Sequence, residues 1–125
     1  KIQPEFKYTN DTRFDFLCDK NIIEVKNVTL FRSKDLAEFP DAVTSRGSKH
    51  LIKLTNSIKN NYNPYVLFLT QIQGINNFRI AKDIDKIYYQ NYKIAKKAGV
   101  KFIAYRCVLN SKEIKIEKKI NIIDE

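Results

Sequence analysis

Apolar residues along this chain follow two spacings, and each spacing predicts a different kind of element. Near the N-terminus, three short apolar or alternating segments are typical of strands: residues 13–18, 22–25 and 28–31. The longest apolar run begins at Tyr65 and ends near Thr70, and its length suits a strand that is buried on both faces. Two later segments complete the predicted strands: residues 100–108, and the weakly alternating residues 113–123, which predict a terminal hairpin or an edge strand.

Two segments carry apolar residues at helical spacing. In the first, from about residue 44 to residue 60, the apolar positions lie three and four residues apart: Leu51, Leu54 and Ile58. Thr44 or Ser45 is the predicted N-cap of this helix. The second helix is predicted to begin near Asp83 or Asp85 and to end at Gly99, since glycine is the usual C-terminal cap.

The order of these elements predicts the fold class. Three strands are followed by helix, strand, helix and strand, and a polar loop is expected at residues 33–41. This order is typical of an α/β fold with a mixed sheet flanked by helices. The 125 residues suit one domain, and neither an internal repeat nor a linker divides them.

Two acids and a lysine in the first strands carry the sharpest chemical signal. Side chains alternate along a strand, so Glu24 and Lys26 are predicted to project to the same side. Asp15, on the neighbouring strand, would add a second carboxylate. Two carboxylates with a nearby ammonium are suited to hold a divalent cation beside a phosphate. The alternative interpretation is a half-exposed hairpin whose charges pair across the strands.

Several blocks around these residues resemble the sugar fermentation stimulation protein A family, in its nuclease-like C-terminal domain. The resemblance covers nearly the whole chain. The blocks that carry it are Arg13-Phe14-Asp15-Phe16, Glu24-Val25-Lys26-Asn27-Val28-Thr29-Leu30 and Phe39-Pro40-Asp41-Ala42-Val43-Thr44, followed by Arg46-Gly47 and Lys49-His50-Leu51.

The resemblance implies a restriction-endonuclease-like core of the PD-(D/E)XK type and DNA binding of low sequence specificity. It also implies a proposed regulatory role in sugar metabolism. Asp15 then takes the place of the metal-binding aspartate, Glu24 that of the second ligand, and Lys26 that of the catalytic lysine. The expected cofactor is Mg²⁺ or Mn²⁺. Members of the family carry an N-terminal OB-like domain, for which this chain has no room, so the chain is expected to be one nuclease-like domain or a fragment.

Two further acids are candidate metal ligands. Glu5 aligns with an acid that often follows an N-terminal helix in this core, and the alternative is an ordinary surface acid near a chain end. Asp41 follows Pro40 before the first helix, where it would coordinate the metal or cap the loop.

A second group of residues is predicted to bind phosphate. Arg46, Lys49 and His50 lie at the start of the first helix, where positive side chains oppose the helix dipole and are suited to an anionic ligand. His50 is also the second choice, after Lys26, for moving a proton. Gln71 follows the buried central strand and is expected to face the ligand crevice, or simply to end the strand.

Net charge and cysteine content add weaker constraints. The chain has a net charge of +9, which favours a polyanionic partner such as DNA, bound mainly through its phosphates. An equally good explanation of the lysine-rich composition is that many of the lysines simply lie on the solvated surface. Cys18 and Cys107 have no metal-ligand spacing, so buried thiols in a reducing cytoplasm are expected. No membrane association is expected, and a homodimer is a further expectation because many nucleases of this kind act as dimers.

Three functions follow for the chain as a whole. The leading hypothesis is a DNA-binding protein of the sugar fermentation stimulation type. The alternatives are a magnesium-dependent DNA nuclease and a truncated, inactive remnant.

Overall fold

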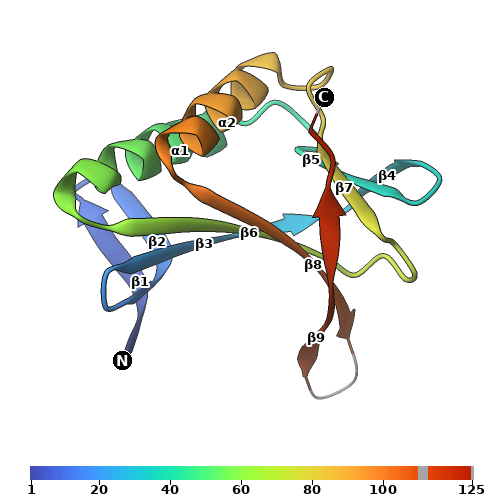
Figure 1. Cartoon of the computed structure of the whole chain (residues 1–125), viewed down its shortest axis with the longest axis horizontal. Coiled ribbons are helices and arrows are strands. Elements are labelled where there is room, and N and C mark those ends of the chain that lie inside the picture. The colour runs from blue at the N-terminus through green and yellow to red at the C-terminus, as the bar shows by residue number, and fades with distance from the viewer. Residues whose placement is uncertain (110–112, 125) are drawn as a thin grey trace.

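The computed structural model describes residues 1–109 and 113–124 (Figure 1). These residues form one large mixed sheet with two α-helices and a short 3-10 turn. In chain order the elements are β1 (Ile2–Thr9), β2 (Thr12–Cys18), β3 (Asn21–Val28), β4 (Leu30–Ser33), β5 (Leu36–Phe39), α1 (Ser45–Ser57), η1 (Ile58–Asn60), β6 (Asn63–Thr70), β7 (Asn77–Ile80), α2 (Lys86–Ala98), β8 (Lys101–Leu109) and β9 (Ile114–Ile122).

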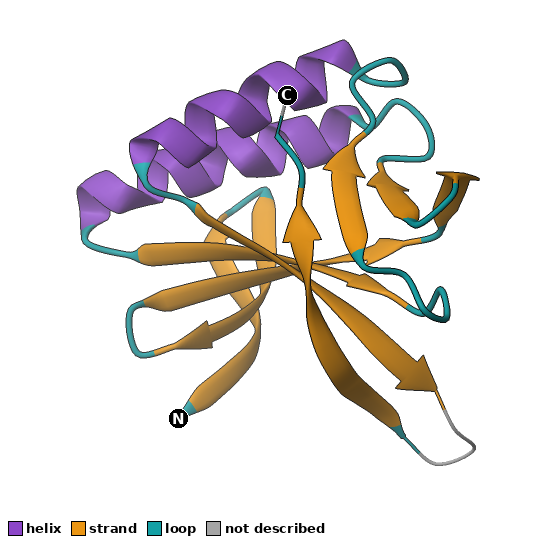
Figure 2. Ribbon diagram, turned by 45° about the vertical axis from the view of Figure 1, so that its right-hand side comes forward, coloured by secondary structure: helices purple, strands orange, loops and turns teal. Residues whose placement is uncertain are grey.

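The sheet is strongly curved, and both helices lie on the same side of it (Figure 2). Its strand order is β1-β2-β3-β6-β8-β9-β7-β5-β4. The central pairs β3–β6 and β6–β8 are parallel, whereas β1, β2 and β3 form an antiparallel meander at one end. The predicted mixed α/β sheet with flanking helices is therefore confirmed.

The helix boundaries follow from local capping chemistry, as the sequence predicts. Thr44 caps α1, because its Oγ1 accepts a hydrogen bond from the backbone N–H of Gly47 at 3.0 Å. Asp85 caps α2 through the N–H of Tyr88 and also accepts the N–H of Thr44 at 2.8 Å, so one carboxylate ties the two helix starts together. Gly99 ends α2 with φ of 118°, a conformation that favours glycine.

Three predictions about the sheet were wrong or incomplete. The segment at residues 33–41 is not only a loop, because Leu36–Phe39 forms β5 and pairs in parallel with β7. Strands β1 and β7 were not predicted at all. Residues 114–122 do form a hairpin with β8, but β9 lies between β8 and β7 and is not an edge strand. Strands β5, β7 and β9 each have one pairing partner that is distant in sequence, whereas β1 pairs with the next strand, β2.

The core lies between the helices and the sheet. Phe68 on β6 stacks on Phe78 of β7 at 4.4 Å between ring centroids, while Tyr88 and Tyr92 bury their rings from α2. Cys107 is buried and Cys18 is half-buried. No helix among the described residues is long and apolar enough to cross a membrane.

Candidate metal and phosphate site

Asp15 and Glu24 meet where the ladder between β2 and β3 ends. Backbone pairing runs from Cys18–Asn21 to Phe16–Ile23 and goes no further. Beyond this point, hydrogen bonds from backbone N–H groups to side-chain carboxylates replace the backbone pairing. Asp15 Oδ2 accepts the backbone N–H of Val25 at 2.7 Å, and Glu24 Oε1 accepts the N–H of Asp15 at 3.3 Å. The strands therefore separate at the point where the two carboxylates face each other.

Glu5 lies on the neighbouring strand β1 at the same level. Pro4 and Phe6 pair with Phe16 and Phe14, so Glu5 is placed opposite Asp15. Its φ is 51°, an uncommon value for a non-glycine residue inside a strand. Glu5 is exposed, and the segment around it is a strand and not the end of a helix.

Glu24 is buried and has two basic partners. Its Oε2 contacts His50 Nδ1 at 2.8 Å and Lys26 Nζ at 3.2 Å. Glu24 and Lys26 therefore do project to the same side, as strand alternation predicts. Burial raises the pKa of Glu24, but the hydrogen bond with His50 and the charge of Lys26 outweigh it, so the net pKa lies below its ordinary value.

The charge on Glu24 determines how His50 is oriented. An ionised carboxylate only accepts hydrogen bonds, so the nitrogen of His50 that faces it, Nδ1, carries a proton. The imidazole ring is also held edge-to-face against Phe14, at 5.6 Å between centroids. The His50 ring, which projects from α1, is thus fixed in one orientation by Glu24 and Phe14.

Asp15 has the opposite electrostatic situation. Burial raises its pKa, the N–H of Val25 opposes this, and the negative charge of Glu24 raises it further. Lys26 compensates only in part. Because two carboxylates share one partly desolvated space, a bound cation would relieve their repulsion.

The donor set fits a hard divalent cation. Among residues 1–109 and 113–124, no group of three or more His, Cys, Asp or Glu side chains is arranged to hold a metal ion. Two carboxylates are nevertheless sufficient for Mg²⁺, which usually keeps several waters and binds through one or two carboxylates together with substrate phosphate. The ligands would be Asp15 and Glu24.

The predicted phosphate-binding residues line one pocket. Arg46, Lys49 and His50 of α1 face the turn between β1 and β2 across a pocket of about 560 Å³, which we call the α1 pocket. Arg13 lines it too. Lys49 is not free, because its Nζ contacts Asp11 Oδ2 at 2.8 Å, and this hydrogen bond is the main cause that lowers the pKa of Asp11. Sequence reasoning missed Arg13 and Asp11, whose only signal was their position near a strand end.

Two predicted residues do not line this pocket. Asp41 is exposed in the loop between β5 and α1 and is not among the residues that line the α1 pocket. Gln71 is exposed just beyond β6. It lines a pocket with Cys107 and Glu117 near the β8–β9 hairpin, and the α1 pocket has a different set of residues.

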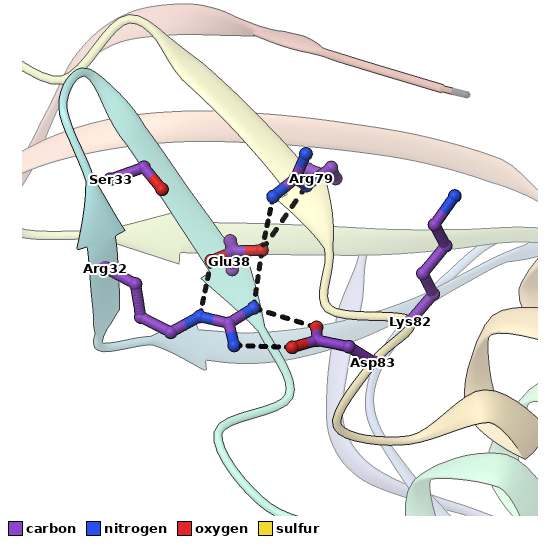
Figure 3. Close-up of a pocket in the computed structure, with 6 residues that line it drawn as sticks. All are labelled: Arg32, Ser33, Glu38, Arg79, Lys82 and Asp83. Carbon is purple, nitrogen blue, oxygen red and sulfur yellow. Dashed lines mark hydrogen bonds and ion pairs between the residues drawn. The ribbon is translucent and has the colours of Figure 1, made fainter.

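A second buried carboxylate went unnoticed in the sequence. Glu38 on β5 is only 1% exposed and is held by the guanidinium groups of Arg32 and Arg79 (Figure 3). The available signal was a single acid inside the apolar stretch Leu36-Ala37-Glu38-Phe39. An acid at such a position needs buried partners, but nothing in the sequence identifies which arginines supply them.

The fold and the site together define a mixed α/β domain with paired strand carboxylates, a lysine beside them and a basic pocket at a helix start. A family model described as the sugar fermentation stimulation protein RE domain matches residues 1–113. The chain belongs to this family, and the resemblance seen in its sequence blocks is confirmed.

Relatives and a solved structure agree with this assignment. The sugar fermentation stimulation protein homolog of Pelagibacter ubique is 61% identical, over 98% of this chain and 55% of the relative. The homolog of Clostridium beijerinckii is 38% identical, over 98% of this chain and 55% of the relative. The chain thus spans about half the length of the curated relatives it matches.

The fold is also that of Pyrococcus furiosus SfsA, whose structure was determined in complex with Ca²⁺. The TM-score is 0.86 at 24% identity, and the match covers 98% of this chain and 54% of the other. At this identity the likeness establishes the fold.

Proposed function

We propose that this domain binds DNA with low sequence specificity, mainly through phosphates, at a PD-(D/E)XK-type site formed by Asp15, Glu24 and Lys26. The observation that carries the proposal is the meeting of two strand carboxylates, with Lys26 Nζ 3.2 Å from Glu24, where β2 and β3 separate. A regulatory role in sugar metabolism, suggested by the family's name, belongs to the same proposal.

A divalent cation, Mg²⁺ or Mn²⁺, is part of the proposed site. Ca²⁺ bound to the Pyrococcus relative supports it, as does the raised pKa of Asp15 beside Glu24. The chemistry such a cation supplies when bound is neutralisation of charge on the phosphoryl oxygens and activation of water. Asp15 and Glu24 would hold it.

The neighbouring basic residues have distinct proposed roles. Arg46 and Arg13 line the α1 pocket and would receive a phosphate by charge-assisted hydrogen bonds. His50 holds Glu24 in place through Nδ1. Because no base-reading motif is present in the sequence, recognition would depend on the backbone of the nucleic acid and on salt.

A salt titration of duplex DNA binding tests this proposal. Arg46→Gln is expected to weaken binding and to flatten the slope of log affinity against log salt by about 0.9, the contribution of one phosphate contact. Lys59→Gln, which removes a charge from the far end of the same helical segment, is the matched control. If both variants bind as the wild type does, the α1 pocket is not the DNA contact.

Metal-dependent cleavage of the phosphodiester is the second candidate function, and the position of Lys26 favours it. An ammonium beside a metal-binding carboxylate would orient a water whose oxygen attacks phosphorus while the bond to the leaving oxygen breaks. Supercoiled DNA should be nicked by the wild type with Mg²⁺ or Mn²⁺, unchanged by Lys7→Ala on exposed β1, and left intact by Lys26→Ala. Equal background nicking by all three proteins would leave only the binding function.

A further inference from the structure

A second polar pocket, of about 400 Å³, lies at the other end of the sheet. It is lined by Arg32 and Ser33 of β4, Glu38 of β5, Arg79 of β7, and Lys82 and Asp83 of the loop that leads into α2. Figure 3 shows the two guanidinium groups and the two carboxylates around one space, with the Lys82 side chain standing beside it. None of these residues belongs to the α1 pocket.

Arg32 lies between two carboxylates that differ in burial. Toward the core, Nε and Nη2 donate to Glu38 at 2.8 and 2.9 Å, and the Glu38 side chain is 1% exposed. Toward solvent, Nη1 and Nη2 donate to Asp83 at 2.7 and 2.9 Å, and the Asp83 side chain is 63% exposed. Glu38 also accepts from Arg79 at 3.1 Å. The buried carboxylate therefore fixes both arginines, whereas the exposed one occupies the outer edge of Arg32.

The two ion pairs differ in how easily they are exchanged. Breaking the pair with Glu38 would leave a buried charge, which is costly. The pair of Arg32 with Asp83 is bidentate, but the Asp83 side chain is 63% exposed, so water and salt compete for it and the pair is much less costly to break than the one with Glu38. An incoming anion can therefore replace Asp83 without disturbing Glu38.

We propose that this pocket binds a phosphoryl group, and that Asp83 occupies the position of that group when it is absent. A phosphate presents two oxygens to the outer edge of a guanidinium, as Asp83 does. A phosphate also carries a second negative charge. The side chains of Arg79, Lys82 and Ser33 line the same pocket and would contact it. The lining carries three positive and two negative side chains, so its charge is positive and becomes more so when Asp83 moves out.

The proposal goes beyond the DNA-binding function, because this pocket shares no residue with the α1 pocket. Two sources of the phosphoryl group have the same chemistry. The group would belong to a free phosphate-bearing molecule or to the backbone of a bound nucleic acid. Inorganic pyrophosphate is the probe for the first source, and duplex DNA is the probe for the second.

Three variants test the pocket by isothermal titration with pyrophosphate. Asp83→Asn keeps the shape of the loop side chain but removes the competing charge, so binding should tighten about two- to fivefold, as expected for loss of one exposed charge pair. Lys82→Gln should weaken binding by a similar factor. Among the described residues Lys82 makes a cation–π contact with Tyr89 but no ion pair, and Glu38 is held by Arg32 and Arg79, so the change does not disturb Glu38. Lys86→Gln, an exposed lysine at the start of α2 that does not line the pocket, should leave binding unchanged.

Two further measurements show where pyrophosphate binds and which kind of molecule supplies the phosphoryl group. Backbone amide shifts on adding pyrophosphate should cluster at residues 32, 33, 79, 82 and 83. A DNA source is indicated when Lys82→Gln flattens the salt slope of DNA binding by about 0.9 while Lys86→Gln does not. An unchanged DNA slope with retained pyrophosphate binding assigns the pocket to a free ligand.

The proposal is overturned if Asp83→Asn and Lys82→Gln leave both pyrophosphate affinity and DNA slope unchanged, or if the shifts occur only at the start of α1. The latter result, with normal DNA binding, would leave the proposed function intact. Loss of DNA binding in Arg46→Gln with pyrophosphate still bound here would separate the two sites.

Discussion

Glu24 and Glu38 are both buried glutamates whose pKa lies below its ordinary value, yet their surroundings differ in kind. Glu38 is held by two guanidinium groups, with the hydrogen bonds of Arg32 as the largest cause of its lowered pKa. Glu24 is held by an imidazole and one ammonium, and a second carboxylate, Asp15, lies beside it. Around Glu38 the positive side chains of Arg32, Arg79 and Lys82 outnumber the carboxylates of Glu38 and Asp83. Around Glu24 the reverse holds, because the carboxylates of Glu24 and Asp15 face the single ammonium of Lys26.

The difference indicates which centre is complete in the protein alone. Arginine is always charged and bonds a carboxylate with two parallel N–H groups, so the Glu38 cluster needs nothing further to be stable. At Glu24, the raised pKa of Asp15 records repulsion and burial that the chain leaves uncompensated. A centre of the second kind is suited to receive a cation, and a centre of the first kind to hold β4, β5 and the loop before α2 together.

The largest effect is expected from neutralising each glutamate in turn. Glu38→Gln leaves two arginines without their shared carboxylate and should lower the free energy of unfolding by about 2–4 kcal/mol, less than for a fully buried pair because both arginines reach solvent. Glu24→Gln should cost about 1 kcal/mol or less without metal, since it also removes the repulsion on Asp15. Urea unfolding measures both losses. Glu117→Gln is the control, because the Glu117 side chain is 47% exposed in its pair with Arg106. Equal losses for the two variants would contradict the comparison.

The next effect is the stabilisation by metal. A tenfold excess of Mg²⁺ or Mn²⁺ over its dissociation constant should stabilise the wild type by about 1.4 kcal/mol, because the ion binds only the folded state. Glu24→Gln should abolish the rise in melting temperature, whereas Glu38→Gln should keep it in full. Lys26→Ala should also keep most of it, since lysine is not a ligand. A rise that survives in Glu24→Gln would place the cation elsewhere.

Asp15→Asn is expected to stabilise the metal-free protein, by up to about 1 kcal/mol once solvent screening is allowed for. The pKa of Asp15 is raised on folding, so ionisation of this group opposes folding above the folded-state pKa and has no effect below the unfolded-state pKa. The advantage of the variant should therefore be present at pH 7 and disappear as the pH falls through about 4. Unfolding curves at both pH values measure it. A variant that is less stable than the wild type at pH 7 would show that Asp15 is already satisfied.

The smallest effect concerns Lys49, which Asp11 holds away from other anions. Asp11→Asn releases the ammonium, so the salt slope of DNA binding should become steeper by about 0.9. Asp19→Asn, in the exposed turn between β2 and β3, makes the same change in net charge at a distance from the pocket. A slope that steepens equally in both variants would be an effect of overall charge and would not identify Lys49.

Features set by neighbours in the chain were predictable from the sequence. Thr44, Asp85 and Gly99 cap the helices through groups three or four residues away, so the helix limits follow from local hydrogen bonding. The common side of Glu24 and Lys26 follows from strand alternation alone. The family follows from contiguous blocks of residues, which a sequence displays directly.

Only the tertiary structure decided which distant groups meet. His50 reaches Glu24 across 26 positions because α1 packs on β6, the parallel neighbour of β3. Arg79 reaches Glu38 across 41 positions because β7 lies beside β5. Strand β9 lies inside the sheet because β7 pairs with the side that β8 leaves open, although the weak alternation of its residues also suited an edge strand. Pairing between strands depends on partners that closure of long loops brings together, and no local pattern of residues specifies those partners.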